Sequence, residues 1–472
     1  MSWSLALPEI VLAVCAMAVL LYGVFQKQEA AFVSTMLTLG ALMLTAVLVL
    51  NTPDGSAYRG LFVVDGFGTF MKLLILSGAA LSVILALDYN RHENISRFEF
   101  PVLIMLSTIG MMIMASTSSM MTLYLGLELQ SLALYVLCAF ARDDLRSAES
   151  GLKFFVLGAL ASGLILYGIS LAYGFSGTMQ FQELAIAVTK ETASPGLIVG
   201  VVFIVAGLAF KLSAVPFHMW TPDVYEGAPT PVTAFMSTAP KVAAIALLLR
   251  ALEIPFGHIT SQWTGLIVLV SLGSMLLGAL AAIGQTNIKR LMAYSSIGHM
   301  GYALVGLAVG TAEGVRGVLV YMATYVFMSV GVFACIIAMR RRGRALEQIS
   351  DLAGLSRTDP AMALAMAMFM WSMAGLPPFS GFFGKLYVFL PAVQAGYWTL
   401  AIVGILTSAV GLFYYLRVIK VMYVDDAVPA FDRRTPSLSF VLGVGAVVTG
   451  LFFLTPAPIV NAAERAAQVL FK

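Results

Sequence analysis

Four ionisable side chains lie deep inside strongly apolar stretches of this sequence, where water is expected to be scarce. They are Glu128, Lys211, Lys241 and Lys385. Chains of ionisable groups inside membrane proteins form proton relays. Burial weakens the hold of a lysine on its proton, and a nearby carboxylate strengthens it again. A lysine whose distance from Glu128 can change could therefore take up and release a proton. Arginine could not replace it, because a guanidinium stays charged.

Three further polar residues are candidates whose depth the sequence leaves open. Lys153 closely follows Gly151, so an interfacial lysine and a functional one fit it equally well. His299 is expected near one end of its span, where a packing histidine is the simpler interpretation. Lys72 is expected near the start of its span, from which a long side chain can reach the outer surface. For the four deep residues, the alternative is a structural ion pair between helices.

The composition indicates that most of the chain is surrounded by lipid. Of 472 residues, 60% are apolar and 11% are charged, against about 25% charged in an ordinary soluble domain. These values exclude a soluble globular protein, a disordered chain and a collagen-like repeat. The net charge is +3, and no basic patch has a solvated face, which excludes a nucleic-acid-binding protein.

A membrane-spanning helix needs roughly 20 apolar residues, and the sequence contains fourteen such stretches. The first has neither a basic leading segment nor a small-residue cleavage site, so we interpret it as a retained helix. We therefore expect an all-α polytopic membrane protein without a soluble domain. The stretches lie near 5–25, 30–50, 67–88, 100–116, 118–140, 151–174, 196–219, 230–252, 263–284, 291–310, 315–339, 361–393, 397–423 and 436–455.

The distribution of basic residues predicts the orientation of the chain. Lys and Arg gather in the odd-numbered connections between the stretches, most densely at Arg340–Arg344. Basic residues favour the cytoplasmic side of a membrane. We therefore expect the odd-numbered connections in the cytoplasm and both termini on the opposite side.

Prolines interrupt two of the stretches that carry a lysine. Pro216 follows Lys211 by five residues, and Pro377 and Pro378 precede Lys385. A proline removes a backbone donor, and the carbonyls it frees inside a membrane must face protein, ions or water. These breaks favour two discontinuous helices beside a hydrated ion path, with a simple kink in a packing helix as the alternative.

The polar positions recur along the chain at a nearly constant interval. Glu128 and His299 are 171 residues apart, Lys211 and Lys385 are 174 apart, and Lys241 and Arg417 are 176 apart. The interval covers five helices, and an odd number turns the second copy upside down, as in secondary transporters. We expect an N-terminal three-helix unit at 1–99, inverted five-helix repeats at 100–259 and 260–424, and a C-terminal helix at 425–472.

The chain carries no motif that could supply the energy for ion transport. It lacks a phosphate-binding Walker loop, a dinucleotide fingerprint after a strand, and ligands for haem or a cluster. Cys15, Cys138 and Cys335 lie apart in apolar runs, so we expect three small buried residues rather than disulfides or a zinc site. We therefore expect neither a cofactor nor a metal in this chain, and an external reaction must drive the relay.

Four segments resemble the antiporter-like membrane subunits of respiratory complex I. They are Gly126–Leu137 (GLELQSLALYVL), Glu149–Phe155 (ESGLKFF), Phe210–Pro231 (FKLSAVPFHMWTPDVYEGAPTP) and Ala374–Phe382 (AGLPPFSGF). The resemblance covers essentially the whole chain, and Phe210–Pro231 is highly specific. It implies fourteen helices with two inverted five-helix units, and a proton-pumping unit within a larger membrane arm.

Position by position, the resemblance places the mid-membrane glutamate of the family at Glu128 and its lysines at Lys211, Lys241 and Lys385. It also implies that Lys153 bridges the glutamate and the central lysine. One sister subunit carries a long lateral helix beyond its core, and another carries glutamate where Lys385 stands. This sequence has neither feature, which points to the remaining sister.

The resemblance further implies the setting of the chain. NADH, FMN, iron–sulfur clusters and quinone would be bound by other subunits of the complex. The partners would be a second antiporter-like subunit, small helical subunits and lipids. The location would be the bacterial inner membrane, with both termini periplasmic.

Two alternatives remain at this point. The charged residues alone would also suit a secondary cation/proton antiporter, either alone or as part of a multi-subunit Mrp-like assembly. A purely structural membrane scaffold would leave the deep charges unexplained.

Overall fold

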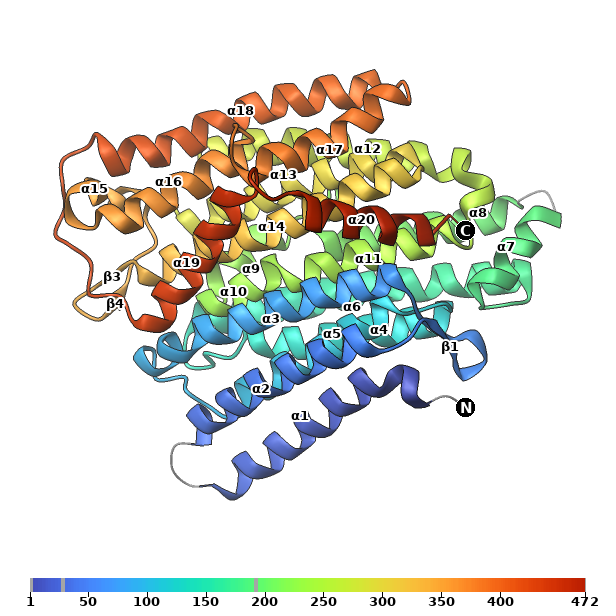
Figure 1. Ribbon diagram of the computed structural model, residues 1–472, viewed down its shortest axis with the longest axis horizontal. Coiled ribbons are helices and arrows are strands. Elements are labelled where there is room, and N and C mark those ends of the chain that lie inside the picture. Colours follow the sequence, from blue (N-terminus) through green and yellow to red (C-terminus); the bar gives the residue numbers. More distant parts are fainter. Residues whose placement is uncertain (1–2, 27–29, 191–193, 472) are drawn as a thin grey trace.

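The computed structural model describes residues 3–26, 30–190 and 194–471, and long helices dominate it. Most of them run along the longest axis of the molecule (Figure 1). Within the described residues, ten helices are long and apolar enough to cross a membrane. Three shorter apolar helices accompany them: α4 (Glu99–Ala115), α16 (Pro360–Ala374) and α19 (Pro436–Leu451). The expected all-helical polytopic membrane fold is confirmed at this level.

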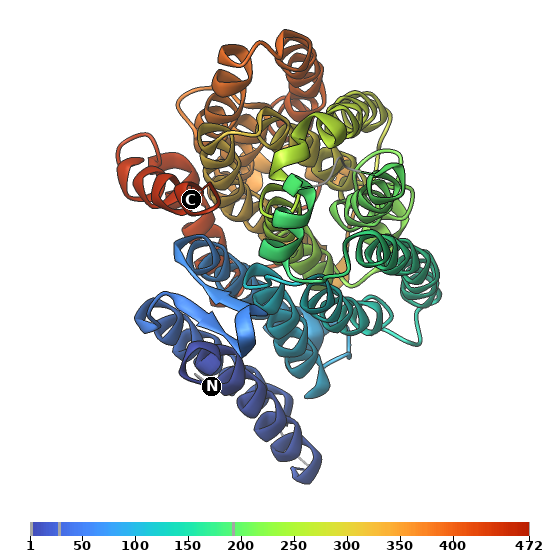
Figure 2. The same ribbon diagram turned by 90° about the vertical axis from the view of Figure 1, so that its right-hand side faces the viewer.

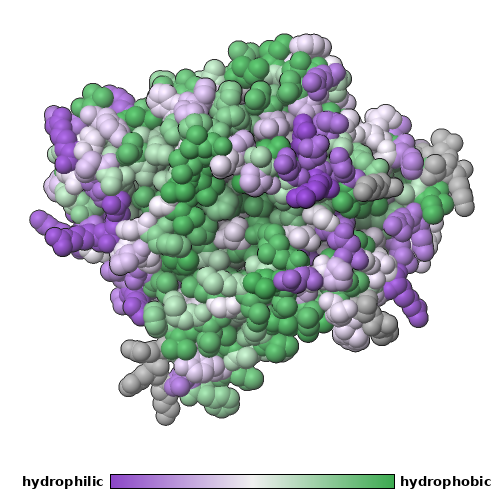
Figure 3. Space-filling view, viewed as in Figure 1, coloured by the Kyte–Doolittle hydropathy of each residue, from purple (hydrophilic) through white to green (hydrophobic). Residues whose placement is uncertain are grey.

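The surface agrees with this arrangement. Apolar residues cover much of the middle of the molecule, and polar residues gather mainly towards its two ends along the helix direction (Figure 3). In lipid, every backbone donor and acceptor must be satisfied within the protein, which helices do by themselves. The apolar middle of this surface is therefore suited to contact with lipid.

The N-terminal part forms one edge of the molecule (Figure 2). Helix α1 (Leu7–Phe25) packs against α2 (Ala30–Asn51) and α4, and α3 (Gly66–His92) joins this unit to the rest. Asp65 caps α3 by accepting a hydrogen bond from the Gly68 amide at 2.7 Å. The remaining elements before α3 are η1 (Trp3–Ala6), β1 (Gly55–Ala57), η2 (Tyr58–Gly60) and β2 (Phe62–Val64).

The prediction for Lys72 is wrong. Its side chain is 3% exposed, and its amine pairs with Glu9 of α1 at 2.6 Å. Glu9 supplies a buried carboxylate at this position, so the lysine does not reach the outer surface. Cys138 and Cys335 are buried as expected, whereas Cys15 is half-buried, and all three thiols are free.

The next helices contain the first broken span. Helix α8 ends where Ser213 adopts a left-handed conformation, just before Pro216, and a short helix, α9, follows. Thr238 separates α10 from α11. The elements are α5 (Met120–Cys138), α6 (Leu145–Ser176), α7 (Phe181–Lys190), α8 (Pro195–Leu212), α9 (Thr221–Gly227), α10 (Thr230–Ser237) and α11 (Ala239–Glu253).

A second broken span follows at the other predicted site. Helix α16 ends at Ala374, Gly375 is left-handed, and α17 begins at Ser380 beyond Pro377 and Pro378. Helix α14 is almost wholly enclosed by its neighbours and forms the centre of the molecule. The remaining elements are η3 (Gly257–Ile259), α12 (Thr260–Ile283), α13 (Ile288–Val309), α14 (Ala312–Ala338), β3 (Arg340–Arg341), β4 (Arg344–Ala345), η4 (Ile349–Leu352), α15 (Leu355–Thr358), α17 (Ser380–Gln394), α18 (Trp398–Tyr423) and α20 (Ala457–Val469).

Candidate functional site

Lys211 occupies the last turn of α8 and is 8% exposed. Its amine donates hydrogen bonds to the Ser131 hydroxyl at 2.9 Å and to the Tyr135 hydroxyl at 3.2 Å. Both partners lie on α5, which also carries Glu128. The amine is therefore held against the same helix as the glutamate.

Glu128 lies about one helical turn before Ser131 on α5 and is half-buried. Its Oε1 atom is buried and has no hydrogen-bond partner within the described residues. The sequence predicts a gate formed by Glu128 and Lys211. In this structure the lysine bonds to two neutral hydroxyls instead, and the carboxylate oxygen stays free.

Lys241 lies at the start of α11 and is 1% exposed. Its amine donates to the Leu212 carbonyl oxygen at 2.7 Å and to the Ser213 hydroxyl. Leu212 is the last residue of α8, where the helix leaves carbonyls without an internal partner. The lysine therefore satisfies a backbone acceptor that the break in α8 has freed.

Lys385, on α17, is 7% exposed and makes the same kind of contact at the second break. Its amine donates to the carbonyl oxygens of Met373 at 3.1 Å and Ala374 at 2.9 Å, and to the Ser408 hydroxyl at 2.7 Å. Both carbonyls belong to the end of α16. Each broken helix thus ends on the amine of a buried lysine.

The three lysine amines share one electrostatic feature. In the part of the chain that the structure describes, each bonds only to hydroxyl or carbonyl oxygens, and none forms an ion pair with a carboxylate. The alternative of structural ion pairs is therefore not observed at these residues. A buried ammonium group that is held only by neutral oxygen atoms is less well stabilised than one paired with a carboxylate.

His299 lies in the middle of α13 rather than near an end, so its expected position is wrong. The helix starts at Ile288, earlier than the sequence indicated, because Asn287 caps it by accepting bonds from the amides of Lys289 and Arg290. The His299 ring nitrogens contact the hydroxyls of Tyr321 on α14 and Tyr415 on α18.

Lys153 does not bridge Glu128 and Lys211 in this structure. Its side chain is 41% exposed, and its amine pairs with Glu149 at 2.7 Å and Asp223 at 2.8 Å. Both carboxylates lie on the same side of the molecule, one on α6 and one on α9. In this structure the two carboxylates hold the amine away from the expected bridging position.

In the expected repeat, Arg417 is the counterpart of Lys241. The contacts of the two side chains are nevertheless different. Arg417, on α18, is half-buried and donates to the carbonyl oxygens of Ile283 at 2.7 Å and Gln285 at 2.5 Å. These carbonyls lie at the C-terminal end of α12. The guanidinium therefore caps a continuous helix instead of a broken one.

An ionic network that was not predicted from the sequence surrounds α9. Arg290 of α13 donates to Asp223 at 2.8 Å and to Glu226 at 2.9 Å, and Lys153 also binds Asp223. Burial alone would raise the pKa of Asp223, but its hydrogen bonds with Lys153 and Arg290 outweigh burial and lower that pKa. The network ties the short helix after the break to α6 and α13. The only available signal was the acidic pair Asp223 and Glu226 within Phe210–Pro231.

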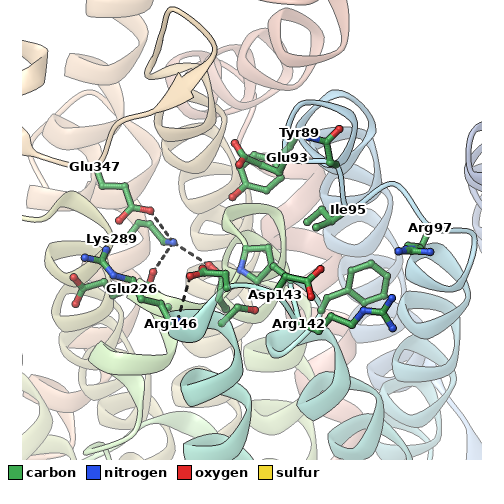
Figure 4. Close-up of a pocket in the computed structure, with 18 residues that line it drawn as sticks. Tyr89, Glu93, Ile95, Arg97, Arg142, Asp143, Arg146, Glu226, Lys289 and Glu347 are labelled. Carbon is green, nitrogen blue, oxygen red and sulfur yellow. Dashed lines mark hydrogen bonds and ion pairs between the residues drawn. The ribbon is translucent and has the colours of Figure 1, made fainter.

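A polar cavity of about 410 Å³ adjoins this network (Figure 4). Residues from several of the odd-numbered connections line it. At its wall, Lys289 donates to the Glu226 carbonyl oxygen at 2.7 Å and to Glu347 at 3.1 Å. The side chains that line it include Tyr89, Glu93, Arg97, Arg142, Asp143 and Arg146. Within the described ranges, no group of three His, Cys, Asp or Glu side chains could hold a metal.

Comparisons with known proteins give a consistent picture. Residues 117–411 match the family model described as NADH:quinone oxidoreductase/Mrp antiporter, TM. The chain is 63% identical to NADH-quinone oxidoreductase subunit N of Granulibacter bethesdensis, with all of both chains covered. It is 56% identical to subunit N of Rhodospirillum rubrum, covering 98% of this chain and 97% of the relative.

Solved structures show the same fold. A chain of respiratory complex I from Thermus thermophilus with bound aureothin is similar, with a TM-score of 0.83 and 33% identity over 97% of this chain and 99% of that one. A chain of the Mrp complex from Dietzia sp. has a TM-score of 0.87 at 22% identity, covering 100% of this chain and 98% of that one. The second likeness concerns the fold alone.

Proposed function

Because this chain belongs to the NADH-quinone oxidoreductase subunit N family of antiporter-like complex I subunits, we propose that it moves protons through a relay of buried side chains. The chain is a subunit of a proton-translocating enzyme of the bacterial inner membrane. The relay consists of Glu128, Lys211, Lys241 and Lys385. Quinone reduction in other subunits drives it.

The observation that carries this proposal is the chemistry of the three amines. Lys211, Lys241 and Lys385 are each at most 8% exposed, and each bonds to neutral oxygen atoms. Hydroxyl and carbonyl oxygens hold an ammonium group less strongly than a carboxylate does. Each lysine can therefore exchange its proton with a neighbour, whereas a lysine in a buried ion pair would be locked in its charged form.

Glu128 and Lys211 form the gate of this relay. When Glu128 turns towards Lys211, the carboxylate stabilises the ammonium and the lysine keeps its proton. When the two move apart, the amine is left with Ser131 and Tyr135 and passes the proton to the next site. The contacts of Lys211 in this structure correspond to the second arrangement.

Lys153 and His299 have supporting roles in this proposal. Lys153 acts at the gate when it leaves Asp223 and turns towards Glu128. His299 contributes through its contacts with Tyr321 of α14 and Tyr415 of α18, two helices that pack against α17, which carries Lys385. Neither residue is one of the four main proton carriers of the relay.

The relay is built on fourteen spans, in which residues 100–259 and 260–424 form two inverted repeats after a unit at 1–99 and before a C-terminal helix at 425–472. Close glycine contacts support this division. An added Cβ would lie 2.5 Å from Gln130 N at Gly110, between α4 and α5, and 2.6 Å from Gly298 N at Gly278, between α12 and α13. The first helix pair of each repeat thus packs through glycine, as membrane helices commonly do.

The proposal includes the orientation that the basic residues favour and the partners that the family resemblance implies. Both termini lie in the periplasm and the odd-numbered connections lie in the cytoplasm. A second antiporter-like subunit, small helical subunits and lipids cover the apolar faces, and NADH, FMN, iron–sulfur clusters and quinone bind elsewhere in the complex. Identity to curated subunit N sequences favours this function over that of a secondary cation/proton antiporter.

The test is to replace Lys211 with Ala in the assembled complex. Removal of the amine should lower the number of protons pumped per NADH oxidised in inside-out membrane vesicles, because the central carrier is lost. Lys211→Arg should also be defective, since a guanidinium does not release its proton. Unchanged stoichiometry in both variants would refute the relay.

A further inference from the structure

We propose that a crevice between α2, α3 and α4 binds a phospholipid whose headgroup carries a hydrogen-bond donor beside its phosphate. The crevice lies where α2 begins, α3 ends and α4 begins, at the edge of the molecule that the N-terminal helices form (Figure 2). None of the four relay residues is among the described residues that line it. The inference therefore goes beyond the proposed function and does not rest on it.

The crevice has a polar mouth and apolar walls. Its mouth carries Arg91 in the last turn of α3, and Ser96 and Arg97 in the connection to α4. A phospholipid has the same order of parts, with a polar headgroup above apolar acyl chains. The apolar side chains of the walls come from all three helices: Phe32, Val83, Ala86, Leu87, Phe100 and Pro101.

Two arginines give the mouth a positive charge. The guanidinium group of Arg91 lies over the ring of Phe32 on α2, 5.0 Å from its centroid, and so reaches across the mouth. Among the described residues that line the crevice, none is Asp or Glu. Guanidinium groups match the geometry of phosphate oxygens, and basic pockets between membrane helices bind lipid headgroups. The mouth is therefore suited to the phosphate of a phospholipid.

The acidic residues nearest to Arg91 along the chain are engaged elsewhere. Asp88 accepts a hydrogen bond from the Ser437 hydroxyl at the start of α19. Glu93 pairs with Arg340 at 2.7 Å. Both carboxylates are thus held by partners outside the crevice, and the positive charge of its mouth remains available to a ligand.

Asn90 adds a requirement for a donor in the headgroup. Its side chain lines the crevice and is 6% exposed, and its Oδ1 atom is buried without a hydrogen-bond partner within the described residues. A buried acceptor that stays unsatisfied is costly. An ethanolamine headgroup can donate a hydrogen bond to this oxygen, whereas a choline headgroup has no N–H or O–H donor. The crevice should therefore prefer phosphatidylethanolamine to phosphatidylcholine.

The experiment labels the assembled complex with photoreactive lipids in vesicles of phosphatidylcholine. Two probes carry the same diazirine on the same acyl chain, one with an ethanolamine headgroup and one with a choline headgroup. They share the phosphate and the net charge, and only the first has a headgroup donor. After irradiation, mass spectrometry measures the amount of lipid attached to peptides of α2 and α3.

Three variants separate the two contacts. Arg97→Gln removes a guanidinium group from the mouth, and Asn90→Leu removes the amide at similar volume. The control, Arg344→Gln, removes an exposed guanidinium group on β4, outside the crevice. Labelling in the wild type should favour the ethanolamine probe about threefold or more, as one hydrogen bond allows.

The variants should change this labelling in different ways. Arg97→Gln should lower labelling by both probes about fivefold, because it weakens the hold on the phosphate that they share. Asn90→Leu should remove the preference for the ethanolamine probe. Arg344→Gln should match the wild type. If Asn90→Leu does not assemble, the headgroup preference of the wild type and the effect of Arg97→Gln decide the question.

Three results would overturn the inference. Equal labelling of the wild type by both probes would contradict the donor that we assign to the headgroup. Equal labelling of Arg97→Gln and Arg344→Gln would contradict a phosphate at the mouth. No label on α2 or α3 in the wild-type complex would mean that another subunit covers the crevice. Proton pumping is not measured here, so each of these results would leave the proposed relay standing.

Discussion

The buried lysines Lys211, Lys241 and Lys385 are surrounded by oxygen atoms without formal charge. Their presence inside apolar runs was visible in the sequence, because charged residues are rare there. Their partners were not, because carbonyl oxygens become available only where a helix ends. The chemistry of these residues is therefore decided jointly by the side chain and by the nearby break in the backbone.

Lys72 and Lys153 show the limit of such reasoning for single residues. Distance along a span suggested that Lys72 reaches the surface, yet Glu9 from a different helix pairs with it in the interior. For Lys153, family resemblance suggested a bridge to Glu128, yet Asp223 and Glu149 bind its amine. Long-range partners of this kind depend on helix packing, which spacing in the sequence does not reveal.

The gate makes a prediction for Glu128. Glu128→Gln should lower the protons pumped per NADH by about twofold or more, because the amide cannot provide the charge that retains a proton on Lys211. Glu128→Asp should be milder, since it keeps the charge on a shorter side chain. Proton uptake by vesicles at matched rates of NADH oxidation measures both. Pumping at the wild-type level in Glu128→Gln would argue against the gate.

At the level of elements, the two broken helices are the features that sequence reasoning located best. Pro216 and the pair Pro377 and Pro378 predicted both interruptions, and α8 and α16 end just before them. The sequence did not show that a lysine amine caps each of the two ends. That contact depends on the fold bringing α11 to the end of α8 and turning α17 back onto the end of α16.

The break between α16 and α17 leads to a prediction for Gly375→Ala. Gly375 has a φ of 85°, and an added Cβ would lie 2.6 Å from Lys385 Cδ and 2.9 Å from its Nζ. The substitution should displace the amine from the Ala374 carbonyl and reduce pumping. Vesicle stoichiometry and the amount of assembled complex measure the effect.

Gly396→Ala is the matched control for this substitution. Gly396 has a φ of 84° but no atom within 4 Å of an added Cβ. It carries the same backbone strain, about 1–2 kcal/mol, without any contact with a lysine. Equal pumping in Gly375→Ala and Gly396→Ala would contradict a role for the position of the Lys385 amine.

Over the whole molecule, the fold class followed from composition and hydropathy, whereas the ionic network around α9 did not. Lys153, Asp223 and Arg290 come from α6, α9 and α13, and their contacts join the two halves of the chain. In a sequence, a charged connection residue that forms an ion pair cannot be told from one that is only solvated, and most are only solvated. Only the packed structure shows which of them meet.

This network predicts how stability depends on pH. The lowered pKa of Asp223 means that its ion pairs stabilise the fold above the pKa of an unfolded aspartate, and that this contribution is lost as the pH falls through the lower, folded value. Asp223→Asn should lower the stability of the detergent-solubilised complex by about 1 kcal/mol or less, because these pairs are partly exposed.

The difference between Asp223→Asn and the wild type should stay constant from about pH 8 to pH 5 and shrink at more acidic pH. Thermal unfolding of the complex, followed at several pH values, measures it. A difference that changes around neutral pH would contradict this assignment, because Asp223 should be fully ionised there.

The claim on which the whole account depends is that protons can pass between the buried groups. A density map of the intact complex, sharp enough to show ordered water, tests it most directly. We expect water molecules and polar side chains to link Glu128, Lys211, Lys241 and Lys385 without a dry gap. Closely packed apolar side chains between these four residues, with no water along the way, would contradict it.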